Sequence, residues 1–247
     1  MSRKLLVLDL NGTLLHRDQN RVIRLRPYLD TFTAFLFHPA TRKWLDSMVW
    51  SSAQPHNVNR MINSAFQRPE SDLLDVWARD KMDIEPHLYS QKTQTVKDFS
   101  KVWSTFPAHS NRSTLLLDDS LSKARLQPHN HLCIEEYLPD LPRPASTDMV
   151  QRSKPDQSLV AVVGVLDALK EASNVESWMK DNSVFRGEQL PVDGGEQSKP
   201  LWFSNPSVVS AWATAGSEAL ARLGIKPLAT QSRPVIMRPG SGRGFRK

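Results

Sequence analysis

The chain has 247 residues, of which 39% are hydrophobic, and this is enough to bury one good core with room for an appendage. Its single cysteine, Cys133, excludes an internal disulfide and a cysteine-rich zinc site, and no stretch approaches the apolar length of a membrane span. The net charge of +6 resides in residues 219–247, which hold seven basic and no acidic side chains, so the rest of the chain is close to neutral.

The first predicted element is a strand at residues 4–8, which ends in Asp9. Its Leu and Val residues do not alternate with polar ones, which is typical of a strand buried on both faces in the middle of a parallel sheet. Open α/β sheets bind their ligands at the carboxyl ends of such strands. A carboxylate there is costly to bury unless a cation or several hydrogen bonds hold it. Because the strand begins so early, we expect no signal or transit peptide and a cytoplasmic or nuclear protein.

The turn after this strand has two interpretations. Asp9 or Asn11 could cap local backbone N–H groups, as such residues often do. Alternatively, Asp9 belongs to a binding turn, which Gly12 favours by allowing a sharp bend and Thr13 by placing a hydroxyl beside the carboxylate.

A second strand follows at Asp46–Trp50 and ends in Ser51 and Ser52. Before it, Val22–Leu25 reads as a short extended piece, and Pro27 suits the first turn of a helix. The two hydroxyls lie beside Asp9 if the two long strands are neighbours. The alternative is an ordinary serine N-cap for the next helix.

The middle of the chain contains three further elements. A helix is expected over Val58–Phe66, a strand over Leu73–Ala78 ending at Arg79, and a short helix over Val96–Trp103. The last of these includes Lys97. Lone lysines are usually solvated, so Lys97 indicates little by itself.

A second buried strand ending in acid lies within residues 112–120, and it finishes with Asp118 and Asp119. Two adjacent carboxylates after an apolar strand repel each other unless a cation lies between them and another anion. In a doubly wound sheet, Asp118 and Asp119 would converge with Asp9 and Ser51 on one crevice. Hard oxygen ligands without His or Cys partners favour Mg²⁺ over zinc.

These segments occur together in an order that indicates a family. They are Asp9–Leu14, Ser51, Lys97, Asp118-Asp119, and, for a narrower branch, Arg26-Pro27, Val96–Ser100 and Leu116–Ser120. In this combination the chain resembles the haloacid dehalogenase (HAD) superfamily of aspartate-nucleophile phosphatases over about residues 4–140. More narrowly it resembles the branch that acts on the RNA polymerase C-terminal domain and related phosphoproteins, also called NLI-interacting-factor-like phosphatases. The resemblance implies an α/β fold: a doubly wound, mostly parallel, Rossmann-like sheet without a large cap, followed here by C-terminal helices.

The resemblance also implies a covalent mechanism. Asp9 would attack phosphorus and form an aspartyl-phosphate. Ser51 would donate to a phosphoryl oxygen, and Lys97 would neutralise phosphate charge and hold Asp9 in place. Mg²⁺ would be bound by the Asp9 carboxylate, the backbone carbonyl of Asn11 and Asp119, with Asp118 as a further ligand or an orienting partner.

Other positions would contact the substrate by the same resemblance. Thr13 would brace the loop, and the backbone N–H groups from Leu10 to Gly12 would surround phosphate oxygens. Ser52 and Arg79 would help to hold the substrate.

One position departs from the family pattern. The family normally has a second Asp two residues after the nucleophile, which protonates the leaving oxygen and then activates water, but this chain has Asn11. An amide can do neither at neutral pH, and general acid–base help is worth about 10²–10⁴-fold in rate. Two functions therefore stay open: a Mg²⁺-dependent phosphatase acting on a Ser/Thr or Tyr phosphate of a phosphoprotein, with weakened turnover, or an inactive relative that binds phosphate or serves as a scaffold. Neither the phosphorylated partner nor the oligomeric state follows from the sequence.

The rest of the chain carries less chemistry. Cys133 lies in an expected last strand, His131–Ile134, as a small core residue, and His129 and His131 are interpreted as surface polar residues. The basic tail should be disordered and solvated, with weak contact to RNA or acidic protein as the alternative. The predicted divisions are a phosphatase domain at 1–141, a Pro-rich connection with helices packing on the domain at 142–185, a linker at 186–204, a helix at 205–224 and the tail at 225–247.

Overall fold

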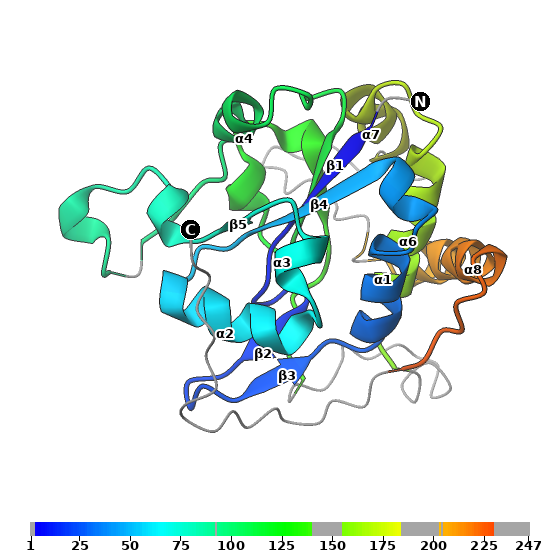
Figure 1. Cartoon of the computed structure of the whole chain (residues 1–247), viewed down its shortest axis with the longest axis horizontal. Helices are drawn as coiled ribbons and strands as arrows, with labels where there is room; N and C mark the ends of the chain where they lie inside the picture. The colour runs from blue at the N-terminus through cyan, green and yellow to red at the C-terminus, as the bar shows by residue number, and fades with distance from the viewer. Residues whose placement is uncertain (1–2, 92, 140–154, 184–202, 204, 230–247) are drawn as a thin grey trace, which may run out of the picture.

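The centre of the protein is a five-stranded parallel sheet with strand order β5-β4-β1-β6-β7 (Figure 1). The computed structural model describes residues 3–91, 93–139, 155–183, 203 and 205–229. The strands of the sheet are β1 Lys4–Leu8, β4 Leu45–Trp50, β5 Val76–Trp77, β6 Thr114–Asp118 and β7 His131–Cys133. Neighbours pair in parallel throughout, so the predicted doubly wound parallel sheet is confirmed. The predicted strand at 73–78 is shorter than expected, with two residues in the ladder.

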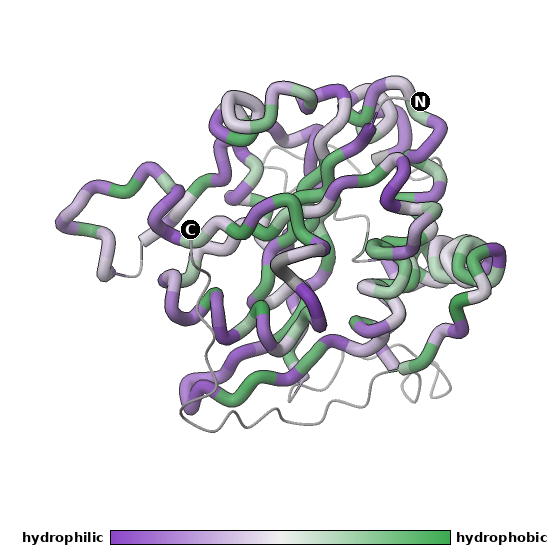
Figure 2. Tube along the Cα trace, viewed as in Figure 1, coloured by the Kyte–Doolittle hydropathy of each residue, from purple (hydrophilic) through white to green (hydrophobic). Residues whose placement is uncertain are grey.

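Helices cover both faces of the sheet, because β1 points alternate side chains into two cores. Leu6 and Leu8 lie in one core and Leu5 and Val7 in the other, and Figure 2 shows the hydrophobic residues gathered along the central strands. The second core is closed by α4. The helices of the chain are α1 Leu29–Leu36, α2 Pro55–Ala65, α3 Pro69–Asp72, α4 Phe99–Thr105, α6 Ser158–Leu169, α7 Val175–Ser183 and α8 Pro206–Arg222.

Shorter elements complete the described chain. A small antiparallel hairpin, β2 Leu15–Arg17 with β3 Ile23–Leu25, follows β1. The 3-10 helices are η1 Thr41–Lys43, η2 Arg79–Lys81, η3 Pro86–Leu88, η4 Leu121–Ala124 and η5 Pro128–Asn130. The described segments between β1 and β6 thus hold short elements and no separate cap domain, as the resemblance implies. None of the described helices combines the length and the apolar character needed to cross a bilayer.

Two helix starts differ from the sequence prediction and matter for the site. Gln54 precedes α2 as its N-cap residue, so Ser51 and Ser52 do not cap this helix. The next difference lies at α4, where Asp98 accepts a hydrogen bond from the backbone N–H of Ser100 at 3.0 Å. The predicted helix at 96–103 therefore begins only at Phe99, and Lys97 lies on the extended segment before it.

The C-terminal helices pack onto the sheet domain as one unit. α6 is buried along almost its whole length, as expected of a helix that is apolar all round, because it lies between the sheet and α8. Two glycines let the two helices touch: a Cβ on Gly164 would lie 2.4 Å from the carbonyl oxygen of Trp212, and one on Gly216 would lie 1.9 Å from that of Val160. The predicted helix at 205–224 is thus present, capped by Asn205, and its apolar face is occupied by α6.

Several predicted divisions fall partly outside the described residues. These are the first part of the division at 142–185, which is described only from residue 155, most of the linker at 186–204, and the tail at 225–247, which is described only to residue 229. The first residues of the predicted tail are described, and Leu228 exchanges hydrogen bonds with the Thr31 hydroxyl on α1 through its N–H (3.0 Å) and carbonyl (3.2 Å).

Asp46 at the start of β4 makes stability depend on acid pH. Burial opposes its ionisation, but hydrogen bonds from Arg3 (2.5 and 2.8 Å) and from His109 hold the pKa of Asp46 well below its ordinary value of 3.8. A depressed folded pKa contributes stability that is complete above the unfolded pKa of about 4, declines as pH falls further and disappears below the folded pKa. Because Arg3 is half exposed, we expect Asp46→Asn to lower the free energy of unfolding by about 1 kcal/mol at pH 6 and by less at pH 3. Urea unfolding at both values checks this, and an equal loss at both would contradict it.

Candidate active site

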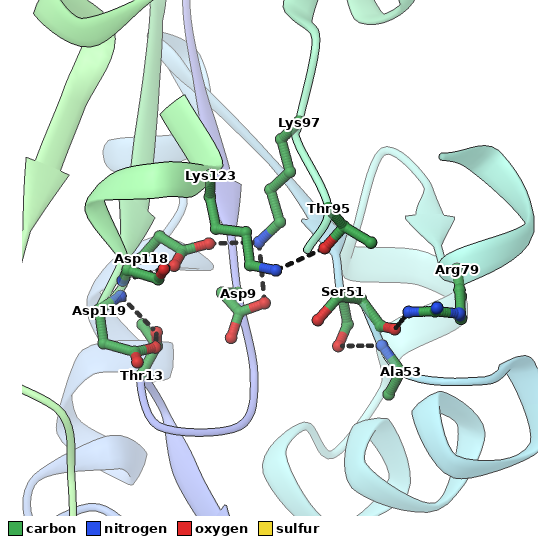
Figure 3. A network of polar contacts seen from close by, with 12 residues as sticks. Asp9, Thr13, Ser51, Ala53, Arg79, Thr95, Lys97, Asp118, Asp119 and Lys123 are labelled. Carbon is green, nitrogen blue, oxygen red and sulfur yellow. Dashed lines mark hydrogen bonds and ion pairs between the residues drawn. The ribbon is translucent and has the colours of Figure 1, made fainter. Parts of the chain in front are cut away.

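Side chains from three neighbouring strands meet at the carboxyl edge of the sheet. Asp9 follows β1, Ser51 follows β4, and Asp118 ends β6. The register aligns them, since Leu8 pairs with Val49 on one side and with Leu117 on the other. Figure 3 shows these side chains facing one another, as the sequence analysis expected. The site lies where the strand order reverses between β1 and β6, which is where doubly wound sheets bind ligands.

Lys97 connects two of the carboxylates from the loop before α4. Its Nζ donates to Oδ1 of Asp9 at 2.8 Å and to Oδ2 of Asp118 at 2.5 Å, and the side chain is fully buried. Burial alone would lower the pKa of Lys97, but the two carboxylates outweigh it and raise it. Lys97 is therefore a permanent cation inside the site, and the view that lone lysines are solvated does not hold for it.

The negative charge of the three carboxylates Asp9, Asp118 and Asp119 exceeds the positive charge of Lys97. Burial raises the pKa of Asp9 to about 7 against the pull of Lys97, and repulsion from Asp118 and Asp119 adds to the rise. Burial and Asp118 likewise raise the pKa of Asp119. Such crowding of acids favours a further cation beside Asp9 and Asp119.

Asp118 and Asp119 are held differently. Both oxygens of Asp118 are occupied, by Lys97 and by the backbone N–H of Ser120 at 2.8 Å, as suits an orienting partner. Asp119 accepts from the Thr13 hydroxyl at 2.8 Å, and its own N–H donates back to that hydroxyl at 3.2 Å. Thr13 thus braces the loop after β1 against the loop after β6.

Gly12 has two reasons to be glycine. Its φ of 91° lies in the left-handed region, and a Cβ there would lie 2.8 Å from the carboxyl atoms of Asp119. Its N–H, expected to contact phosphate, donates to the carbonyl of Leu15 at 2.8 Å in this structure, and the phosphate contact stays a prediction. The N–H groups of Leu10 and Asn11 carry no hydrogen bond within the described residues and stay candidates.

The two interpretations of the turn after β1 apply to different residues, Asn11 and Asp9. Its Oδ1 accepts the backbone N–H of Arg17 at 2.7 Å, so this side chain does cap local backbone, on the β2–β3 hairpin. Asp9 does not, because its side chain bonds Lys97 and no backbone N–H in the described chain.

Ser51 is buried, and its Oγ accepts the N–H of Ala53 at 3.3 Å, which leaves the hydroxyl proton for a ligand. Arg79 is also buried, but its guanidinium donates to the carbonyls of Ser52, Leu88, Tyr89 and Gln91 at 2.7–3.4 Å. Arg79 thus holds the 88–91 segment against the strand end, and its substrate contact, like that of Ser52, stays a prediction.

Comparisons with known proteins identify the family of the chain. The family model described as NLI interacting factor-like phosphatase matches residues 4–176, well over half of the chain. This chain belongs to the NLI interacting factor-like phosphatase family. An uncharacterized FCP1 homology domain-containing protein of Schizosaccharomyces pombe is 28% identical over 198 residues, covering 72% of this chain and 76% of that protein. The structure of Fcp1, an essential RNA polymerase II CTD phosphatase, aligns with a TM-score of 0.41 at 12% identity, covering 90% of this chain and 64% of that chain.

Phosphatases of this family depend in general on a divalent metal, and the residues present fit one. No three His, Cys, Asp or Glu side chains converge as a metal cluster among the described residues. The expected set needs only the carboxylates of Asp9 and Asp119 with the carbonyl of Asn11. That is a normal set for a hard cation that keeps several waters, and the surplus negative charge around Asp9 favours it.

The sequence analysis missed three residues of this phosphatase site. Lys123 reaches it from η4, and its Nζ donates to the Thr95 hydroxyl at 2.5 Å (Figure 3). Arg26, 1% exposed, donates to the carbonyl of Thr13 at 2.9 Å and so supports the loop after β1. Thr95 and Lys123 had no sequence signal beyond their nearness to Lys97 and Asp119. Arg26 was noted only as part of a motif.

The sequence prediction for His131, which lies on β7, was wrong. His131 is buried rather than exposed, with Nε2 at 3.1 Å from the carbonyl oxygen of Asp118, and burial lowers its pKa. His129 is half-buried. Cys133 is a buried core residue as predicted, and burial raises the pKa of its thiol to about 12.

Proposed function

We propose that this protein is a Mg²⁺-dependent phosphatase that uses Asp9 as its nucleophile and acts on a phosphoprotein. The observation that carries the proposal is the buried Lys97, which fixes Asp9 and Asp118 at the carboxyl ends of two adjacent strands. A purely structural ion pair of Lys97 with Asp9 and Asp118 would need no third carboxylate. The carboxylate of Asp119 nevertheless lies next to this ion pair, and the Thr13 hydroxyl donates a hydrogen bond to it. A phosphoryl site needs all of these groups.

In the first step an oxygen of the Asp9 carboxylate attacks phosphorus, and the bond from phosphorus to the leaving oxygen breaks. The product is an aspartyl-phosphate, which water then hydrolyses to inorganic phosphate and the free carboxylate. Lys97 holds the nucleophile in line, and Ser51 donates its hydroxyl proton to a phosphoryl oxygen. Mg²⁺ bound through Asp9 and Asp119 would supply charge neutralisation.

Asn11 sets which substrates are turned over well. Its amide cannot protonate the leaving oxygen or activate water, and it already accepts from Arg17. Aryl and acyl phosphates, whose leaving groups need no proton, should therefore react faster than the alkyl phosphates of Ser and Thr. A phosphoprotein suits the site because the described segments between β1 and β6 hold short elements and no separate cap domain that would cover a bound peptide loop.

The same residue supports a second candidate function. A domain that keeps the metal and phosphate ligands but lacks the acid would act as a phosphate-binding or scaffold protein. It would bind a phosphorylated partner at Asp9 without releasing phosphate.

An aryl phosphate assay with and without Mg²⁺ separates these functions. We expect turnover that requires Mg²⁺ and disappears in Asp9→Asn, a nearly isosteric change that keeps the fold but removes the nucleophile. Acid-quenched ³²P labelling of the wild type should reveal an acyl phosphate. Bound phosphate without turnover or labelling would favour the scaffold, and activity retained in Asp9→Asn would contradict both.

A further inference from the structure

Lys123 places a second ammonium group in the site. It lies in η4, the turn that follows Asp119, and its Nζ donates to the Thr95 hydroxyl at 2.5 Å. Figure 3 shows this ammonium next to that of Lys97, on the side of Asp9 where Ser51 and Thr95 also lie. Neither the family motifs nor the mechanism above assigns Lys123 a task.

Its position is fixed by the backbone. The N–H of Lys97 donates to the carbonyl of Lys123 at 2.9 Å, which ties the loop before α4 to η4. Thr95 and Lys97 alternate on an extended segment and are both buried, at 3% and 0% exposure, so their side chains point to the same side. The two lysines are thus built into one wall of the site.

The ammonium of Lys123 has unused capacity. It forms no ion pair within the described residues and gives one of its three N–H bonds to Thr95. Burial, together with the nearby charge of Lys97, lowers its pKa. Two cations held close together in a half-buried place are unfavourable unless an anion joins them. The carboxylates of Asp9 and Asp118 attract Lys123 from a distance, but their ion pairs within the described residues are with Lys97.

We propose that Lys123 is a phosphoryl-binding residue, whose Nζ donates to a non-bridging oxygen of the substrate phosphoryl group while Thr95 fixes its direction. This rests on the phosphatase site proposed above. A phosphoryl dianion that approaches Asp9 meets three carboxylates, of which Lys97 compensates only a part. A second ammonium offsets the repulsion on the side away from Asp119, and it would continue to do so in the aspartyl-phosphate.

The test compares Lys123→Met, Lys123→Arg and Thr95→Val, with Lys101→Met as the matched control. Lys101 lies on nearby α4, and within the described part of the chain its ammonium binds the exposed Asp83 side chain and the carbonyl of Lys81. The probe is inorganic phosphate, titrated calorimetrically with Mg²⁺ present, alongside kcat and KM for an aryl phosphate. A charge-assisted hydrogen bond predicts a roughly 10- to 100-fold weaker phosphate affinity in Lys123→Met. We expect a smaller loss in Thr95→Val, partial rescue in Lys123→Arg and no change in Lys101→Met.

The outcomes separate this proposal from the phosphatase itself. Unchanged phosphate affinity and KM in Lys123→Met, with Asp9→Asn inactive, would overturn the role of Lys123 and leave the phosphatase standing. Phosphate binding that depends on Lys123 in a protein without turnover would support this role and contradict the phosphatase. If Lys123→Met does not fold, as seen by its melting temperature, Thr95→Val and Lys123→Gln decide by the same titration. Equal affinity in all variants would overturn the proposal.

Discussion

Asn11→Asp should raise kcat for phosphoserine or phosphothreonine peptides by about 10²–10⁴-fold, which is roughly 3–5 kcal/mol of barrier. The introduced carboxyl group can give a proton to the leaving oxygen and then accept one from water. The fold should tolerate the change, because the hydrogen bond from the N–H of Arg17 needs only an oxygen acceptor. Steady-state kinetics near pH 6, with the same peptides and Mg²⁺, measures the effect.

An aryl phosphate is the matched control for this variant. Its leaving group needs no proton, so Asn11→Asp should change its first step much less. The double change with Asp9→Asn should be inactive on both substrates, since the nucleophile is then missing. Equal gains in kcat/KM, which reports the first step, on alkyl and aryl phosphates, or no gain on either, would contradict the idea that Asn11 limits turnover through the missing acid.

Gly216→Ala should be among the most destabilising single changes in the chain. The added methyl would lie 1.9 Å from the carbonyl oxygen of Val160, and backbone cannot turn aside as a side chain can. Overpacking of this kind costs about 3 kcal/mol, even though alanine favours a helix more than glycine does. The melting temperature should fall by roughly 6–12 °C, which thermal unfolding followed by circular dichroism checks.

A control on the same helix isolates the contact. Ala211 is exposed on α8, so Ala211→Val adds bulk without meeting another element, and it should cost about 0.5 kcal/mol. If Gly216→Ala were as mild as Ala211→Val, α8 would not be packed closely on α6.

Local sequence patterns sufficed to predict most of the sheet and the meeting of three side chains of the site. β1 and β6 are unbroken apolar runs that end in acid, and β4 ends in serine, so the parallel register brought Asp9, Asp118 and Ser51 together as expected. α6 lies within residues 142–185, where helices that pack on the domain were predicted, and it is apolar on all sides. Each of these features depends on a short, continuous stretch of sequence, in which the apolar residues and the polar residue that follows them can be read directly.

What was missed depends on contacts between distant segments. Lys123 and Thr95 meet across a loop and a turn, and Arg26 reaches Thr13, Glu135 and Asp156. His131 looked polar, but a partner for its ring nitrogen is supplied by the carbonyl of Asp118 on the next strand. The start of α4 was misplaced because the Asp98 cap was overlooked, although Asp98 was visible in the sequence.

The contacts of Arg26 determine where the chain can be truncated without loss of stability. Its fully enclosed guanidinium is neutralised by Asp156, just ahead of α6, and also donates to the Ser158 hydroxyl. A recombinant fragment that ends at residue 141 would leave the buried Arg26 charge without Asp156 beneath the loop after β1, and it would expose the apolar side chains that α6 covers. We therefore expect a fragment that folds on its own to include α6 and α8, which pack closely on each other.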